Sequence, residues 1–202
     1  DLEIRGAGNL LGGEQSGHIA AVGFDLYVRL VGEAVAEFKG ETTDEVPEVK
    51  VDLPIDAHLP HDYVPGERLR LEAYKKIAAA HTDAELATVL EELRDRYGEP
   101  PQEVANLMAV ASFRARAREL RLTDVAMQGK YVRFAPLELR ESQTVRLQRL
   151  YPGSLVKPAT NTVLVPAPTT ARIGGQPLRD QELLDWCRSL LDALEVPLPA
   201  DR

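Results

Sequence analysis

The sequence predicts an α+β fold, in which helices pack against short antiparallel strands and hairpins. Apolar residues recur at helical spacing in several segments, and elsewhere the pattern changes to the alternation that is typical of strands joined by short turns. Hydrophobic residues make up 44% of the chain and charged residues 28%, which is ordinary for a globular protein. With 202 residues, the chain is long enough for one sizeable domain and an appendage.

Composition and patterning divide the chain into four parts. Residues 1–40 are predicted to form an arm made of a glycine-rich loop and a helix, and residues 41–47 a short acidic linker. Residues 48–196 are predicted to form the main domain. Residues 197–202 contain two prolines and are expected to be a tail.

The first half of the main domain predicts one strand and three helices. Residues 48–53 alternate between polar and apolar side chains, which is typical of a strand, and prolines then interrupt the chain. Thr82 is placed to cap the second helix, and Glu85, three residues further on, completes the pattern of a capping box. The predicted helices cover residues 67–80, 82–97 and about 101–121.

The second half of the main domain alternates between hairpins and helices. Gly129 lies in the turn of the first predicted hairpin and Asn161 in the turn of the second. The last helix carries Cys187 on its apolar stripe, so this cysteine is predicted to be an inert core thiol. The predicted strands cover residues 124–127, 131–135, 155–157 and 162–165, and the helices cover residues 138–150 and 180–194. The apolar residues of the helix at 138–150 are Val145, Leu147 and Leu150.

The charge balance limits the partners that this chain can bind. The formal net charge is −8 at pH 7 and the sequence pI is about 5.1, so the phosphates of a nucleic acid repel the chain as a whole. A basic protein partner suits an acidic surface better. No apolar run is long enough to cross a bilayer, and a single cysteine cannot form an internal disulfide. We therefore expect a cytoplasmic protein with no membrane partner.

The sequence offers no set of residues that predicts catalysis. His58 and His61 lie near Asp56 and Asp62, but a metal site needs a fixed backbone and a third strong ligand, and prolines break this segment. No Gly-Lys-Ser/Thr nucleotide-binding loop and no Ser/His/Asp or Cys/His set stands out. We expect this chain by itself to be no enzyme and to hold no metal or cofactor.

The opening residues carry a resemblance to a known motif. They read DLEIRG at 1–6, QSG at 15–17 and GF at 23–24, and Arg5 and Gln15 bracket the glycine-rich loop. This pattern resembles the end of the translocation motif that bacterial branch-migration helicases share with transcription-repair coupling factors. The resemblance implies that Arg5 and Gln15 help to convert nucleotide-driven closure of a motor into movement along duplex DNA. Since the first residue is not Met, we expect the chain to be part of a larger protein.

A second resemblance separates the two families. The sequence LPHDYVP at residues 59–65, followed by Arg68 and Tyr74, resembles the opening of a C-terminal domain that is peculiar to bacterial transcription-repair coupling factors. This implies a parent protein that uses ATP and Mg to move on double-stranded DNA and displaces stalled RNA polymerase. It also implies recruitment of nucleotide excision repair through the damage-recognition protein.

Three charged residues on the predicted helix at 82–97 are candidate contact residues. Glu92, Asp95 and Arg96 are three and four residues apart, so they share one flank of the helix beside its apolar stripe. The surrounding ELRDRYG at residues 92–98 resembles the family segment that docks on the N-terminal repair-protein-binding domain of the same polypeptide. The resemblance implies an autoinhibitory contact in cis, although such charges also occur on ordinary solvent-exposed helix faces.

An alternative function rests on the basic end of the helix at 101–121. Four arginines lie there, and as one face they would suit a DNA-binding accessory domain of a branch-migration helicase. Cations near a helix C-terminus are also favoured by the helix dipole, so a purely structural role is the competing interpretation. The four residues are Arg114, Arg116, Arg118 and Arg121.

Overall fold

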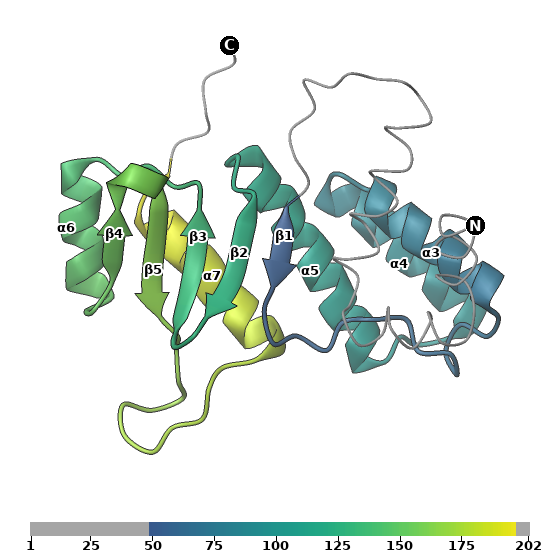
Figure 1. Cartoon of the computed structure of the whole chain (residues 1–202). Helices are drawn as coiled ribbons and strands as arrows, with labels where there is room; N and C mark the ends of the chain where they lie inside the picture. Colours follow the sequence, from purple (N-terminus) through teal and green to yellow (C-terminus); the bar gives the residue numbers. More distant parts are fainter. Residues whose placement is uncertain (1–48, 197–202) are drawn as a thin grey trace, which may run out of the picture. The chain divides into compact units, whose positions relative to one another are not determined.

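The computed structural model describes residues 49–196 of the chain. The predicted arm with Arg5 and Gln15, the linker at 41–47 and the tail at 197–202 lie outside the described residues. The described chain forms two compact units (Figure 1). The first unit comprises residues 56–115, and the second comprises residues 49–55 together with 116–196. The predicted boundary between arm and main domain stays a prediction.

The first unit is helical, as its apolar periodicity predicts. Its helices are α3 (Glu67–Ala79), α4 (Asp83–Tyr97) and the greater part of α5 (Gln102–Glu119). The predicted cap is confirmed, because the Glu85 N–H donates to Thr82 Oγ1 at 3.1 Å. The return bond differs from a standard capping box, since the Glu85 carboxylate accepts the N–H of His81 at 2.7 Å. The large apolar side chains buried in this unit are Leu59, Tyr74, Ile77, Leu86, Leu93, Leu107, Met108 and Phe113.

The proline-broken segment before α3 is fixed to the helices by buried polar bonds. The Leu59 N–H donates to the hydroxyl of Tyr74 on α3 at 2.9 Å, and burial raises the pKa of this tyrosine. The amide of Asn106, which is 2% exposed on α5, donates to the carbonyl of Asp56 at 3.0 Å. These bonds satisfy backbone groups that no sheet or helix can pair. The segment is therefore ordered although it has no regular structure.

The second unit contains a mixed sheet of five strands. They are β1 (Lys50–Asp52), β2 (Asp124–Gln128), β3 (Tyr131–Ala135), β4 (Leu155–Lys157) and β5 (Thr162–Pro166), in the order β1-β2-β3-β5-β4. Both predicted hairpins are confirmed, with β2 antiparallel to β3 and β4 antiparallel to β5. The expectation of antiparallel pairing throughout is wrong at one edge, because β1 pairs with β2 in parallel. The helices between these two strands form the long connection that a parallel pair needs.

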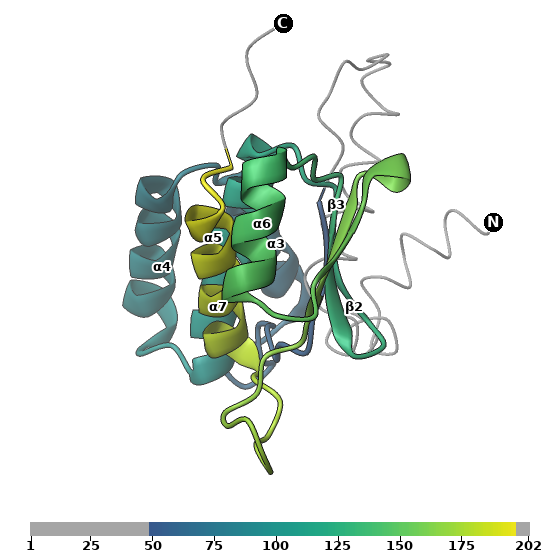
Figure 2. The same ribbon diagram turned by 90° about the vertical axis from the view of Figure 1, so that its left-hand side faces the viewer.

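Helices α6 (Glu141–Leu150) and α7 (Asp180–Ala193) lie on the same side of the sheet (Figure 2). α6 begins three residues later than predicted, because the Leu137 N–H bonds the carbonyl of Asn161 at 2.7 Å and keeps this stretch extended. The predicted apolar face of α6 is only partly correct. Leu147 is fully buried, whereas Val145 is 61% exposed and Leu150 is 46% exposed.

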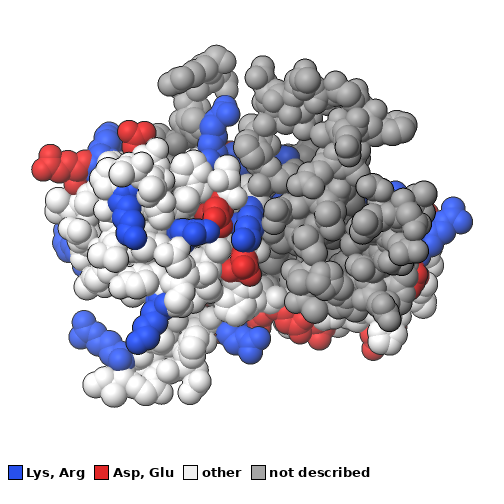
Figure 3. Space-filling model, viewed as in Figure 1, with Lys and Arg blue, Asp and Glu red and all other residues white. Residues whose placement is uncertain are grey.

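Charge is distributed unevenly along the described chain. Residues 56–115 hold 7 Lys and Arg against 11 Asp and Glu, a net charge of −4. Residues 49–55 and 116–196 hold 13 Lys and Arg against 10 Asp and Glu, a net charge of +3. Figure 3 shows that the Lys and Arg side chains on the face in view are spread among uncharged residues rather than joined in one patch. Among the described residues, the acidic surplus therefore belongs to the helical unit, while residues 1–48, with 3 Lys and Arg against 10 Asp and Glu, account for most of the net charge of the whole chain.

We predict that Tyr74→Phe destabilises the first unit by about 1–3 kcal/mol, because the buried Leu59 N–H then loses its acceptor. Tyr63→Phe is the matched control, since the Tyr63 hydroxyl makes its bond to the Gly98 carbonyl at an exposed position and its loss should cost less. Urea unfolding followed by circular dichroism measures both changes. Equal losses of stability in the two variants would contradict the account of the 56–64 segment.

Candidate functional site

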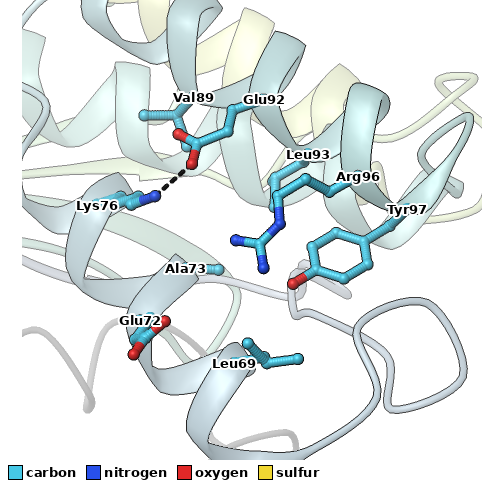
Figure 4. A pocket seen from close by; sticks show the side chains of 9 residues that line it. All are labelled: Leu69, Glu72, Ala73, Lys76, Val89, Glu92, Leu93, Arg96 and Tyr97. Atoms are coloured by element: carbon cyan, nitrogen blue, oxygen red, sulfur yellow. Dashed lines mark hydrogen bonds and ion pairs between the residues drawn. The ribbon is translucent and has the colours of Figure 1, made fainter.

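The candidate site is a shallow groove between α3 and α4, which we call the α3–α4 groove (Figure 4). Its floor is apolar and its rim is charged, and every residue that lines it belongs to the helical unit. Leu93 is buried at its base, while Leu69 and Val89 are half-buried. The lining residues are Leu69, Glu72, Ala73, Lys76, Val89, Glu92, Leu93, Arg96 and Tyr97.

Glu92 lies on the rim of the groove and is held from the opposite helix. Its carboxylate forms an ion pair with the ammonium of Lys76 on α3 (Figure 4). The side chain of Glu92 is 42% exposed and that of Lys76 is 47% exposed, so water reaches both groups. An ion pair this exposed contributes about 0–1 kcal/mol to stability. It fixes the direction of the carboxylate more than it stabilises the fold.

Arg96 occupies the other end of the groove and is held by an aromatic ring. Its guanidinium carbon lies 5.3 Å from the centre of the Tyr97 ring, within the range of a cation–π contact. The Tyr97 ring meets the Tyr63 ring edge to face, with centres 5.9 Å apart. The Tyr63 hydroxyl in turn donates to the carbonyl of Gly98 at 2.8 Å. Tyr63 and Gly98 therefore position the ring on which Arg96 rests.

The third predicted contact residue stands apart from the groove. Asp95 is exposed on α4 and is not part of the groove lining described above. Its neighbour Arg94 pairs with Glu91 and, at 3.2 Å, with Glu99; the carboxylate of Glu99, followed by that of Glu91, raises the pKa of Arg94. The structure thus brings Glu92 and Arg96 to one groove and leaves Asp95 on the adjoining surface.

The residues that α3 contributes were missed by sequence reasoning. Lys76 forms one side of the rim, and Leu69 and Ala73 form part of the floor. Their spacing of three and four residues marks one face of a helix, which is a signal in the sequence. The pairing of that face with α4 depends on tertiary packing, and no local pattern encodes it.

The predicted basic face at the end of α5 is not formed. Arg114 is only 6% exposed, because it lies on the same side of the helix as Val110 and Ala117, which are also buried. Arg116 pairs with Glu119 at 3.6 Å and with Asp192 at 3.5 Å. The arginines therefore do not make a continuous surface for phosphates, and the alternative of a DNA-binding accessory domain loses its main support.

Reactive and metal-binding chemistry is sparse in residues 49–196. His58 Nδ1 lies 2.9 Å from the Asp56 carboxylate. Nowhere in residues 49–196 do three or more His, Cys, Asp or Glu side chains form a group that could hold a metal ion. Cys187 is fully buried, and desolvation raises the pKa of its thiol to about 12. The predicted core position of Cys187 is confirmed, while its lack of reactivity and the absence of a cofactor stay predictions. None of the helices in this part of the chain is long and apolar enough to span a membrane.

Comparisons with known proteins agree on one family. The TRCF domain family model matches residues 53–149. A transcription-repair-coupling factor of Mycobacterium bovis is 48% identical over 206 aligned residues, which cover 96% of this chain and 17% of the relative, and that of Mycobacterium tuberculosis matches equally. The Staphylococcus aureus protein of the same name is 43% identical over 134 residues, covering 65% of this chain and 12% of the relative.

A solved structure supports the fold. The crystal structure of the C-terminal domain of a transcription-repair coupling factor superposes with a TM-score of 0.54 at 21% sequence identity, covering 74% of this chain and 95% of that one. The helical unit, the mixed sheet and the matched family model thus define a chain with a TRCF domain. The chain belongs to the transcription-repair-coupling factor family and corresponds to the C-terminal region of such a protein. It spans 17% of the length of the mycobacterial relatives.

We predict that this chain binds duplex DNA only weakly, and that any binding at low salt disappears at physiological salt. The net charge of −8 and the burial of Arg114 are the physical reasons. Fluorescence anisotropy with a labelled duplex at about 50 and 200 mM salt measures this. Tight binding at the higher salt, weakened by Arg118→Ala or Arg121→Ala, would restore the DNA-binding alternative.

Proposed function

We propose that this chain is the regulatory C-terminal region of an ATP-driven translocase that moves on double-stranded DNA, displaces stalled RNA polymerase and recruits nucleotide excision repair. The observation that carries this proposal is the 48% identity with a transcription-repair-coupling factor over 96% of the chain. ATP and Mg would act in the motor of the parent protein, because the sequence of this chain contains no nucleotide-binding loop. Its own contribution would be regulatory and not catalytic.

The proposed regulation is a contact in cis through the α4 flank, which comprises Glu92, Asp95 and Arg96. In the closed state this flank docks on the N-terminal repair-protein-binding domain of the same polypeptide and covers the surface that the damage-recognition protein needs. Engagement of stalled RNA polymerase releases it. The side chains of Glu92 and Arg96 are held on the rim of a groove and are accessible, which supports a role in recognition. The acidic surplus of residues 56–115 favours a basic partner surface.

The strength of such a contact determines how much the equilibrium shifts when it is lost. Truncating one member of a charge pair that is buried by docking costs about 2–5 kcal/mol, and a pair at the rim of an interface costs much less. The apparent dissociation constant for the damage-recognition protein equals the intrinsic dissociation constant divided by the fraction of molecules that are open. Weakening of the closed state is therefore visible as tighter binding of that protein.

We predict that Glu92→Ala/Asp95→Ala/Arg96→Ala in the intact protein allows binding of the damage-recognition protein without RNA polymerase and raises basal ATPase activity. The fold should survive, because the buried residues of α4, Leu86 and Leu93, are unchanged. Titration calorimetry and a coupled ATPase assay measure the two effects.

The matched control for this variant changes the same types of charge in the second unit. Glu138→Ala/Arg149→Ala/Asp185→Ala removes two acids and one base at exposed positions and should leave both measurements at the wild-type level. If the α4 variant is folded and both its affinity and its ATPase rate equal those of the wild type, the proposed contact in cis does not exist.

A further prediction concerns the opening loop, which the proposal places in the translocation motif. In the intact protein, Arg5→Ala or Gln15→Ala should leave DNA-stimulated ATP hydrolysis within about threefold of wild type and abolish movement along duplex DNA, because transmission rather than chemistry is broken. Triplex displacement measures translocation, and release of a stalled RNA polymerase measures function. Arg149→Ala, at an exposed position of the second unit, is the control. Normal displacement by either variant would refute the role.

A further inference from the structure

We propose that Lys76 on α3 is an internal competitor that holds Glu92 in the open state and must release it when the partner docks. The inference rests on the proposed docking of the α4 flank. The two side chains face each other across the α3–α4 groove and form an ion pair that closes one end of its rim (Figure 4). A partner that presents a cation to Glu92 therefore meets a carboxylate that is already paired.

The geometry makes this pair exchangeable. Lys76 and Glu92 are 47% and 42% exposed, so an incoming side chain can reach the carboxylate without opening the packing of the helices. The other charged side chains of the rim have partners of their own. Glu72 pairs with Arg68 at 3.5 Å on α3, and Arg96 rests on the Tyr97 ring at the opposite end of the groove. Lys76 is thus the cation that a basic partner side chain would have to replace.

The groove also defines the chemistry of the partner segment that fits it. Its floor is shallow, with half-buried Leu69 and Val89 beside the buried Ala73, so one apolar side chain can rest on it rather than enter it. A basic side chain on one side of that residue meets Glu92, and an acidic side chain on the other side meets Arg96. The occupant is accordingly a segment with a basic, an apolar and an acidic residue in sequence or on one helix face. Docking of this segment exchanges the Lys76–Glu92 pair for pairs between the two partners.

If Lys76 competes for Glu92, loss of Lys76 stabilises the closed state, and if Lys76 only positions Glu92, the same loss destabilises it. If Lys76 competes, its loss removes an interaction that the open state has and the docked state lacks, and it removes repulsion of the partner's cation. The closed state then becomes more stable relative to the open state. If Lys76 only orients Glu92 for docking, its loss weakens the closed state. The apparent affinity of the intact protein for the damage-recognition protein distinguishes the two, because that affinity falls when the closed state gains.

The test uses Lys76→Met in the intact protein, since Met keeps the aliphatic stem and removes the charge. The dissociation constant for the damage-recognition protein, without RNA polymerase, should rise about two- to fivefold, the range expected for an exposed pair. Lys76→Arg, which keeps a cation, should behave like wild type. In a Glu92→Ala background, Lys76→Met should have a smaller effect, because the competing pair is already absent and only the repulsion between Lys76 and the partner's cation remains. An unchanged or lower constant for Lys76→Met alone overturns the competition.

A second pair of variants tests the apolar part of the recognition. Leu69→Ser removes apolar surface from the groove floor and should lower the dissociation constant, whereas Leu150→Ser, on exposed α6 surface, should not change it. An effect of Leu150→Ser equal to that of Leu69→Ser overturns the assignment of the groove. If the α4 triple variant leaves binding unchanged, the docking proposal itself fails. If the triple variant opens the protein and Lys76→Met does not close it, only the competition is wrong.

Discussion

The candidate site depends on how little of α4 the helical unit buries. Leu86 and Leu93, two turns apart, are its buried residues, while Val89 remains half-buried beside α3. This narrow contact leaves room for a groove between the two helices, so that charged side chains of α4 can stand at its edge without leaving the water. A wider apolar stripe would have closed the groove and placed Glu92 on an ordinary outer face.

Accessible charges become useful for recognition when their directions are fixed before binding. The Arg96–Tyr97 contact does this at one end of the groove, and the Tyr63 ring supports it. At the other end the Lys76–Glu92 pair occupies the carboxylate before a partner arrives. The ordering of Arg96 lowers the entropy cost of docking, and because each contact is weak, neither makes the free state too stable to exchange. Under the proposed regulation the contact opens during each cycle, so this balance matters more than affinity.

The local elements were predictable from the sequence because their signals are local. The Thr82 cap, the glycine turn at Gly129 and the left-handed Asn161 all act within a few residues. Parallel pairing of β1 with β2 depends on a connection of some seventy residues, and no turn signal marks it. The basic run from Arg114 to Arg121 left a charged face open as one interpretation, but Arg114 lies beside Phe113 and Ala117, which are fully buried.

The candidate site, like the fold, was predictable only where its residues follow from a local pattern. Glu92 and Arg96 follow from one helix, whereas Lys76 enters the site only through the packing of α3 against α4. Hydrophobic periodicity does not indicate which part of the chain attracts a charged partner, but the charge distribution does. The groove belongs to the unit with net charge −4. In the unit with net charge +3, Arg133 pairs with Asp124 and Arg146 pairs with Glu195. A basic partner would therefore be attracted to the helical unit more than to the second unit, and under the competition proposed above Lys76 already occupies the carboxylate that this partner needs. In the proposed mechanism, attraction by the whole unit and local competition by one side chain act in opposite directions, and their balance would leave the closed state strong enough to form and weak enough to open.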